Sequence, residues 1–452
     1  MVSLFTRKRG IEAEVDPALR ILRRNMRGDA LSGIILLVST FAALIVANSH
    51  LYHWYEEFLH LHVSFNIGSF GVDHAMHEWI NDGLMVVFFL LVTLEIKRES
   101  MIGVLSSPKK AMLPVIAAIG GMVAPVLIFI IFNKDPEVDK AWAIPMATDI
   151  AFSLGILSLL GKRVPLGLKV FLTAFAIADD LGAVLVIVFF YSSSIDMTYL
   201  GLAFGALSLL VIANRLNVRL VFPYIFVGFM VWYFMLESGV HSTIAGVLVG
   251  LTIPMKSHIS TPDFFNKMRA SFRIFMSEET NTEKKHDNIM TKDQLSCLDN
   301  INSDSRLVLG PLQNLEHGLH KFSAFIVLPL FAFANTGVRL VGEANLEMSF
   351  FPFIIMIALL VGKTLGVFSF SMIAKRLGIV EFPEELTSKA LLGMGILGGI
   401  GFTMSLFIAM LSFEPGMYLD QAKIGILGGS FFSGILGYFY LKLFVFKDNK
   451  ED

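Results

Sequence analysis

The chain has 452 residues, of which 55% are hydrophobic and 16% are charged, and its formal net charge is -2. Soluble domains carry about 25% charged residues, so this composition excludes an ordinary soluble protein. The near-neutral charge says nothing about partners, and we expect no nucleic-acid partner. The single cysteine, Cys297, excludes an internal disulfide framework and a multi-cysteine metal site.

Long apolar runs predict an all-α polytopic membrane protein. Lys and Arg are concentrated in alternate loops, which predicts that both termini lie in the cytoplasm. We expect about twelve transmembrane helices, at residues 31–49, 79–97, 111–132, 143–160, 167–191, 198–213, 220–236, 240–255, 321–338, 351–374, 389–411 and 422–444.

The predicted organisation has five parts. They are a basic cytoplasmic N-terminal tail (1–30), the first eight transmembrane helices (31–255), a polar cytoplasmic insertion (256–313), the last four transmembrane helices (314–446) and a C-terminal tail (447–452). We expect the insertion to be a largely flexible segment with one short amphipathic helix near residues 264–276.

The loop after the first span predicts a small extramembrane β-hairpin at residues 61–73. Residues 62–67 alternate between polar and apolar, Gly68-Ser69 follows, and an apolar pair flanks Gly71. This pattern suits two strands around a type II′ turn. A lone hairpin is marginally stable in water, so we expect it to pair with a second copy in a homodimer.

Two spans are interrupted at corresponding places. Pro145 and the polar residues 147–149 break the span at 143–160, and residues 398–401 (GGIG) break the span at 389–411. Paired broken segments predict inverted-topology repeats whose two interrupted helices cross near a site. The three-span units would be residues 111–191 and 351–444.

Four ionisable side chains lie at membrane depth: Asp149, Asp179, Asp180 and Lys363. A charge at the bilayer centre costs about 2.5–3.5 kcal/mol or more, so such residues indicate a path for a cation or a proton. Crossed helices bring two positive N-terminal ends and two negative C-terminal ends together. Asp149 could balance the former and Lys363 the latter, while one of the two neighbouring aspartates pairs with Lys363 and the other faces a ligand.

Structural readings of the same residues stay open at this point. Asp179 and Lys363 could form a purely structural ion pair, and Asp149 could be a helix cap only. The Thr148 and Thr403 hydroxyls could bond to backbone rather than to an ion.

Several motifs together carry a resemblance to a known family. They are INDGLMVVFFLLVTLEIKRE (80–99), LPVIAAIGG (113–121), WAIPMATDIAFSLGILSLLGKRVP (142–165), AIADDLGAV (176–184), SGVHSTIAGVLVG (238–250), LPLFAFANTGV (328–338), GKTLG (362–366) and GILGGIGFTMSLFIA (395–409). In this order they make the chain similar, over nearly its whole length, to the NhaA family of bacterial sodium/proton antiporters.

The resemblance implies a secondary transporter of the bacterial inner (plasma) membrane, not an enzyme, that needs no cofactor. It would exchange Na⁺ or Li⁺ for H⁺ electrogenically and under pH regulation, in support of pH homeostasis and salt tolerance. Asp180 would be a main Na⁺ ligand and Asp179 the second carboxylate. Asp149 and Thr148 would line the site, and Asp82 would lie in the funnel toward it. The implied pH-sensing residues are Glu95, Arg98, Glu99, Glu316, His317, His320 and His241.

The chain departs from the family pattern in a few places. The insertion at 256–313 is longer than expected, and threonines stand at 93 and 364 where glycine and proline are common. Three rival functions are weighed against exchange. An intramembrane aspartyl protease would need a glycine-x-glycine-aspartate motif that is absent here; a sodium-coupled symporter would need a large solute pocket; a passive channel fits poorly with a lysine at the site.

Overall fold

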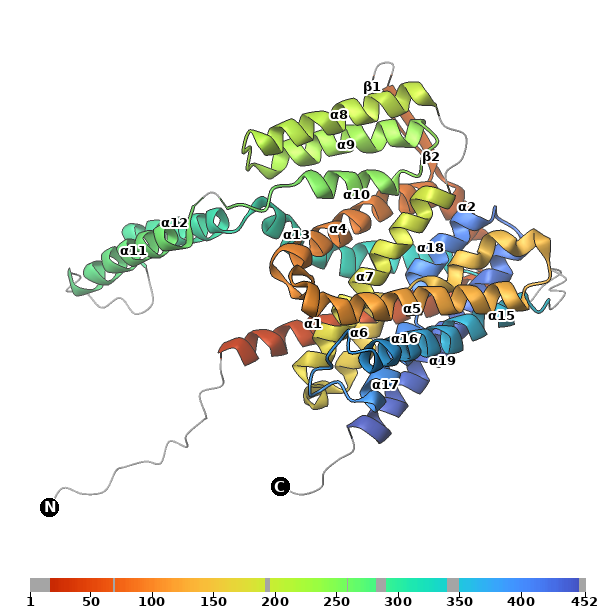
Figure 1. The fold of residues 1–452 in the computed structure, drawn as a ribbon. Coiled ribbons are helices and arrows are strands. Elements are labelled where there is room, and N and C mark those ends of the chain that lie inside the picture. The colour runs from red at the N-terminus through yellow and green to blue at the C-terminus, as the bar shows by residue number, and fades with distance from the viewer. Residues whose placement is uncertain are drawn as a thin grey trace.

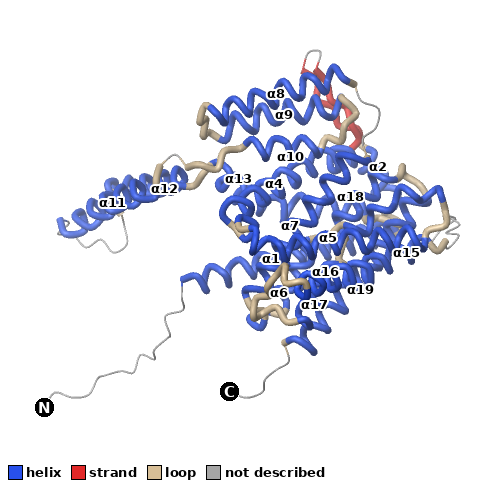
Figure 2. Tube along the Cα trace, in the orientation of Figure 1, coloured by secondary structure: helices blue, strands red, loops and turns tan. Residues whose placement is uncertain are grey.

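The computed structural model describes residues 17–67, 70–191, 196–257, 259–281, 290–339 and 349–446, which form a helical bundle with one small sheet (Figure 1, Figure 2). Helices suit this apolar chain because lipid cannot satisfy backbone hydrogen bonds. Within these ranges, seven helices are long and apolar enough to cross a membrane, and three bent pairs and two shorter apolar helices accompany them. Each of the predicted spans has a counterpart among these elements, so the predicted fold class is confirmed.

The N-terminal part leads from a long helix into the hairpin. Helix α1 (Pro17–Ala47) turns by 112° into α2 (Tyr52–His60). Strands β1 (His62–Ile67) and β2 (Phe70–Ala75) are antiparallel, with His62 opposite Ala75. The predicted hairpin is therefore confirmed, while its turn residues 68–69 lie outside the described residues. The short α3 (Met76–Glu78), the π-helical turn η1 (Trp79–Leu84) and α4 (Met85–Ile102) then form one continuous span.

The first three-span unit contains the first broken helix. A 3-10 turn η2 (Val104–Ser106) precedes α5 (Pro108–Phe132). A 3-10 helix η3 (Pro136–Met146) is bent by 48° from α6 (Ile150–Leu159), and the two are separated by extended backbone at 147–149. A second 3-10 turn, η4 (Gly161–Arg163), leads to α7 (Leu166–Phe190), which carries the two neighbouring aspartates near its middle.

Three helices form a second apolar cluster beside this unit. They are α8 (Met197–Arg215), α9 (Val221–Glu237) and α10 (Thr243–Thr252), and α10 packs on α4. Side chains from other helices cap the C-terminus of α10. The Lys97 ammonium donates to the Leu251 and Ile253 carbonyls at 2.6 Å each, and the Asn214 amide donates to the Thr252 carbonyl. These bonds satisfy carbonyls that the helix itself leaves unpaired.

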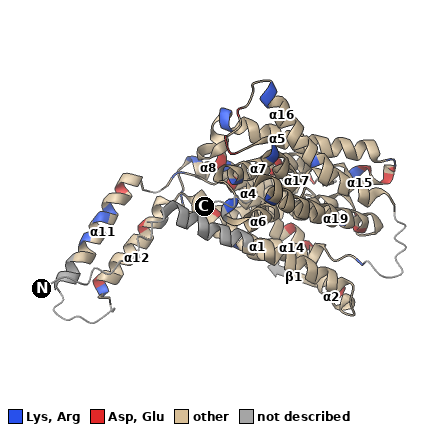
Figure 3. Ribbon diagram, turned by 90° about the horizontal axis from the view of Figure 1, so that it is seen from below, with Lys and Arg blue, Asp and Glu red and all other residues tan. Residues whose placement is uncertain are grey.

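The insertion is more helical than predicted. It contains α11 (Thr261–Asn281), which covers the predicted amphipathic helix, and a second helix, α12 (Lys292–Val308). Thr291 and Gln294 form a capping box that starts α12. The two helices pack together as an arm that projects from the bundle and carries charged side chains (Figure 1, Figure 3).

The second three-span unit repeats the layout of the first. Helix α13 (Pro311–Phe322), η5 (Ser323–Val327) and α14 (Leu328–Asn335) lead to it. It consists of α15 (Phe351–Ile357), η6 (Ala358–Gly362) and α16 (Lys363–Arg376), then the broken pair α17 (Ser388–Gly398) and α18 (Phe402–Ser412), then α19 (Met417–Tyr440) with η7 (Leu441–Val445). The broken pair bends by 43°.

Close backbone contact joins the two units through α5 and α16. A Cβ on Gly120 would stand 2.4 Å from the Gly366 carbonyl oxygen, and one on Gly366 would stand 2.0 Å from the Gly120 oxygen. Only glycine permits this approach, which is typical of helix packing in membranes. The contact fixes α16, and with it Lys363, against the first unit.

Candidate functional site

The two broken helices cross in antiparallel directions at their breaks. The Asp149 N–H donates to the Ile400 carbonyl at 2.7 Å, and the Thr148 hydroxyl donates to the Gly398 carbonyl at 2.9 Å. On either side, the Ser153 hydroxyl donates to Leu397 at 3.0 Å and the Ser405 hydroxyl donates to Ile144 at 2.8 Å. Across the two flanking bonds the residue numbers rise on one helix as they fall on the other, from Ile144 with Ser405 to Ser153 with Leu397, which agrees with the predicted crossing of inverted repeats.

Asp149 caps both helices that begin at the crossing. Its Oδ1 accepts from the Phe152 N–H of α6 at 2.9 Å, and its Oδ2 accepts from the Thr403 N–H of α18 at 3.1 Å and from the Thr403 hydroxyl. Each N-terminus carries about half a positive charge. One buried carboxylate therefore faces two positive helix ends.

Lys363 places a positive charge at a negative helix end. Its ammonium donates to the Met146 carbonyl, the last of η3, and to Oδ2 of Asp179 at 2.8 Å. Lys363 and Asp179 are both 0% exposed. The ammonium thus balances one helix C-terminus and one carboxylate in a place that water does not reach in this conformation.

The neighbouring carboxylates have different partners. Asp180 is 2% exposed, and its Oδ1 accepts no hydrogen bond from any described group; Oδ1 of Asp179 is likewise unpaired. Successive residues of a helix point about 100° apart, so the two groups share one region of α7 at different angles. A buried carboxylate oxygen without a donor is costly and invites a cation or a proton.

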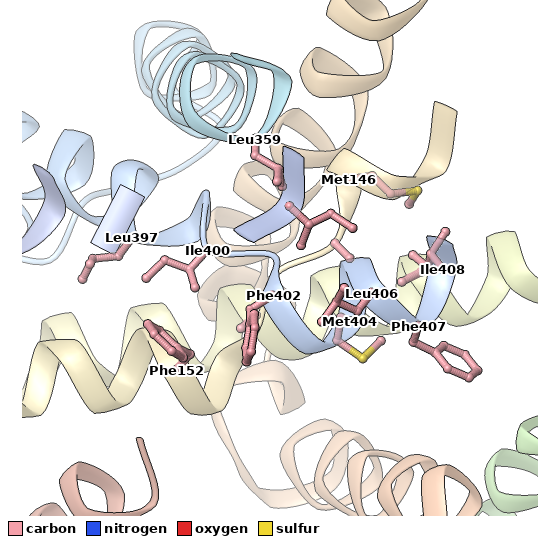
Figure 4. Close-up of a cluster of buried hydrophobic side chains, with 14 of the residues drawn as sticks. Met146, Phe152, Leu359, Leu397, Ile400, Phe402, Met404, Leu406, Phe407 and Ile408 are labelled. Carbon is pink, nitrogen blue, oxygen red and sulfur yellow. The ribbon is translucent and has the colours of Figure 1, made fainter. Parts of the chain in front are cut away.

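Apolar side chains surround the crossing. Met146, Phe152, Leu359, Ile400 and Phe402 belong to one buried cluster around the breaks (Figure 4). Such a shell lowers the local dielectric, which strengthens every charge interaction inside it. The crossing is therefore a small polar centre within an apolar core.

A cavity of about 740 Å³ opens on the hairpin side of the bundle. Asp82 and His241 line it, whereas neither Asp179 nor Asp180 does. Oδ1 of Asp82 accepts from the Ser242 hydroxyl at 2.9 Å, and the His241 ring bonds the Tyr191 carbonyl. Asp82 thus lines a cavity that neither residue of the aspartate pair lines.

The residues implied in pH sensing fall into two places. At the far end of α4, Arg98 pairs with Glu316 and with Glu99, both at 2.8 Å, and so ties α4 to α13. Glu95 lies near enough to this group to interact with Arg98 and Glu316. His317 follows Glu316 directly and His320 lies one turn further along α13; both are exposed. His241 stands at the cavity on the other side.

Sequence reasoning did not single out several polar residues that the structure brings to these places. Ser153 bonds across the crossing, Ser242 holds Asp82, and Lys97 caps α10. A hydroxyl four residues after the Asp149 break was a usable signal for Ser153. Among the described residues, no group of three or more His, Cys, Asp or Glu side chains is placed to hold a metal ion.

Comparison with known proteins identifies the family of the chain. A family model described as Na⁺/H⁺ antiporter 1 matches residues 23–441. The chain is 41% identical over 431 residues to the Na⁺/H⁺ antiporter NhaA of Helicobacter pylori (strain P12), covering 95% of this chain and 97% of that protein. It is 44% identical over 419 residues to NhaA of Bacteroides fragilis, covering 91% and 94% of the two chains. It is 42% identical over 429 residues to NhaA of Glaesserella parasuis serovar 5, covering 93% and 96%. These relatives are named as transporters, not enzymes, and the chain belongs to the NhaA family of Na⁺/H⁺ antiporters.

Proposed function

We propose that this multi-pass membrane antiporter exchanges Na⁺ for H⁺ by competition at Asp179 and Asp180. The observation that carries the proposal is the unpaired, buried Oδ1 of Asp180 beside a second carboxylate. Na⁺ is a hard cation that favours oxygen ligands, and charged carboxylates attract it. Protons neutralise the same oxygens and release it. Because the two acids are neighbours, they titrate as one coupled pair.

Lys363 makes the competition sharper. In this structure its ammonium neutralises Asp179, so one of the two carboxylates is already paired. A cation that arrives at Asp180 draws Asp179 to itself and loosens Lys363 from its partner. The Asp149 cap and the Thr148 hydroxyl hold together the breaks of the two interrupted helices next to this site.

The direct test uses Asp180→Asn in proteoliposomes. The amide keeps the size of the side chain but cannot take a negative charge, so Na⁺-dependent proton movement should be lost while the protein still inserts and folds. Thr364→Ser is the matched control, because that hydroxyl bonds the Leu360 carbonyl of the preceding turn η6. Exchange near the wild-type level in Asp180→Asn would refute the ligand role.

We further propose that exchange is electrogenic and that Li⁺ is also carried. Two carboxylates offer two proton places for one alkali ion, so each cycle would move net charge and respond to membrane potential. An imposed potential should therefore drive Na⁺ uptake in vesicles that have no pH gradient. A rate that ignores the potential would make the exchange electroneutral. Replacing Na⁺ by Li⁺ and then by K⁺ in the same assay measures selectivity.

pH regulation is assigned to the Arg98–Glu316 contact between α4 and α13. The contact lies beside Glu99 and near Glu95, so a change of charge there alters how the two helices are held. Glu316→Gln should displace the pH at which exchange becomes active, with the maximal rate retained. An activation profile identical to that of the wild type would remove Glu316 from the regulation.

We propose that the protein is a homodimer of the bacterial inner membrane, with both termini cytoplasmic. Among the described residues the sheet has two strands only, so the outer edge of β1 or β2 could take a strand from a second copy. Deleting residues 62–75 should convert dimers to monomers in native mass measurements. Dimers that survive the deletion would place the interface elsewhere.

A further inference from the structure

We propose that Phe89, Phe331 and Phe407 form an aromatic layer that closes the route between the hairpin-side cavity and the aspartate pair. In this role the three rings keep Na⁺ and H⁺ movement coupled. The inference rests on the proposed function of Asp179 and Asp180 as the exchange site.

The three rings come from three helices, and those of Phe89 and Phe331 both pack against Phe407. The Phe407 ring of α18 lies 5.3 Å from that of Phe89 on α4 and 6.4 Å from that of Phe331 on α14. Phe89 and Phe407 are 2% exposed and Phe331 is 0% exposed. Tilted ring pairs at such distances are favourable contacts, so the aromatic layer is closed in this conformation.

The position of the layer follows from the helices that carry it. On α18, Thr403 binds Asp149 at the crossing, Phe407 comes one turn later and lines the cavity, and Met410 lines the cavity too. On α4, Asp82 lines the cavity, and Phe89 lies seven residues beyond it, about 10 Å further along the helix. Both helices therefore place the layer between the cavity and the crossing, and Figure 4 shows Phe407 on α18 well past the break at Ile400.

An apolar constriction of this kind stops ions by excluding water. A bare Na⁺ cannot pass between packed rings because it would lose its hydration without gaining oxygen ligands. Exchange from the hairpin side therefore requires the layer to open. If it stayed open while the opposite side is also open, Na⁺ would run downhill without a returning proton.

Thiol labelling tests the barrier without relying on transport. The background is Cys297→Ser with Met404→Cys, since Met404 is 1% exposed and lies three residues before Phe407, on the same side of α18. A charged, membrane-impermeant thiol reagent is applied from the hairpin side. Labelling should be slow with Phe407 in place and faster by about tenfold or more with Phe407→Ala, since a large-to-small change opens a void in the layer.

Two further variants keep the test decisive. Phe129→Ala is the matched control, because Phe129 is 1% exposed, pairs with Phe351 at 6.3 Å and does not line the cavity. It should leave the labelling rate unchanged. Phe407→Leu, which preserves most of the apolar volume, should give a smaller increase. Equal rates in all variants, or equal acceleration by Phe129→Ala, would overturn the proposal.

Transport supplies the second readout. Protons returned per Na⁺ moved, measured with a pH dye and labelled Na⁺ in the same vesicles, should fall in Phe407→Ala and stay at the wild-type ratio in Phe129→Ala. An unchanged ratio in Phe407→Ala would contradict a coupling role. Failure of the aspartate site is seen separately: active Asp180→Asn refutes that site, while the labelling experiment still measures the aromatic layer.

Discussion

Asp149 caps two helix N-termini at once, so its removal should lower the stability of the fold substantially. In Asp149→Ala the buried N–H groups of Phe152 and Thr403 both lose their acceptor. Each unpaired buried group costs about 1–3 kcal/mol, so the loss should be about 2–6 kcal/mol. Asp149→Asn retains one acceptor oxygen and should lose about half as much.

The assay is thermal denaturation of the purified protein in detergent, with Thr403→Val as the matched partner. Thr403→Val removes the hydroxyl that donates to Asp149 and keeps the backbone donor. Residues that share hydrogen bonds are non-additive, so the double-mutant cycle should show a coupling of about 1 kcal/mol or more. An Asp149→Ala variant as stable as wild type, or purely additive changes, would refute the double-cap reasoning.

Three further predictions concern other parts of the bundle. Lys363→Met should destabilise by about 3–5 kcal/mol because it strands Asp179, and adding Asp179→Asn should restore much of the loss in denaturation midpoint; no recovery would mean that the pair is not a unit. Gly366→Val should prevent folding or insertion because its side chain would enter the Gly120 backbone, and normal amounts of stable protein would contradict the close contact. The Thr198 N–H lowers the pKa of the exposed Asp196 carboxyl at the start of α8, so this cap is at full strength above the ordinary pKa of about 3.9 and weakens as pH falls through the lowered value. The stability difference between wild type and Asp196→Ala should therefore shrink in acid, and a difference that grows in acid would show the sign to be wrong.

The membrane architecture was accessible from sequence because its signals are local. Apolar runs, loop charges and two interrupted spans predicted the bundle and the crossed helices. The hairpin followed from alternation around Gly68-Ser69. The spans and the hairpin are each determined by one short stretch of chain, and the crossing was predicted from the matching positions of the two breaks in the two repeats.

The finer contacts were not accessible because they join distant segments. Nothing near Lys97 in the sequence indicates that it caps α10, and nothing near Ser405 indicates that it bonds the Ile144 carbonyl. Helix α12 was missed because its composition is polar, and in the structure it packs on α11. Such partners emerge only when the fold brings the segments together.

The central claim is that Na⁺ and protons compete for one pair of carboxylates. Isothermal titration of the purified protein with NaCl, repeated in buffers of different ionisation enthalpy and over a series of pH values, measures binding and proton release together. Na⁺ binding should release protons, and the affinity for Na⁺ should fall as the pH is lowered. Na⁺ binding with no proton release at any pH would contradict it.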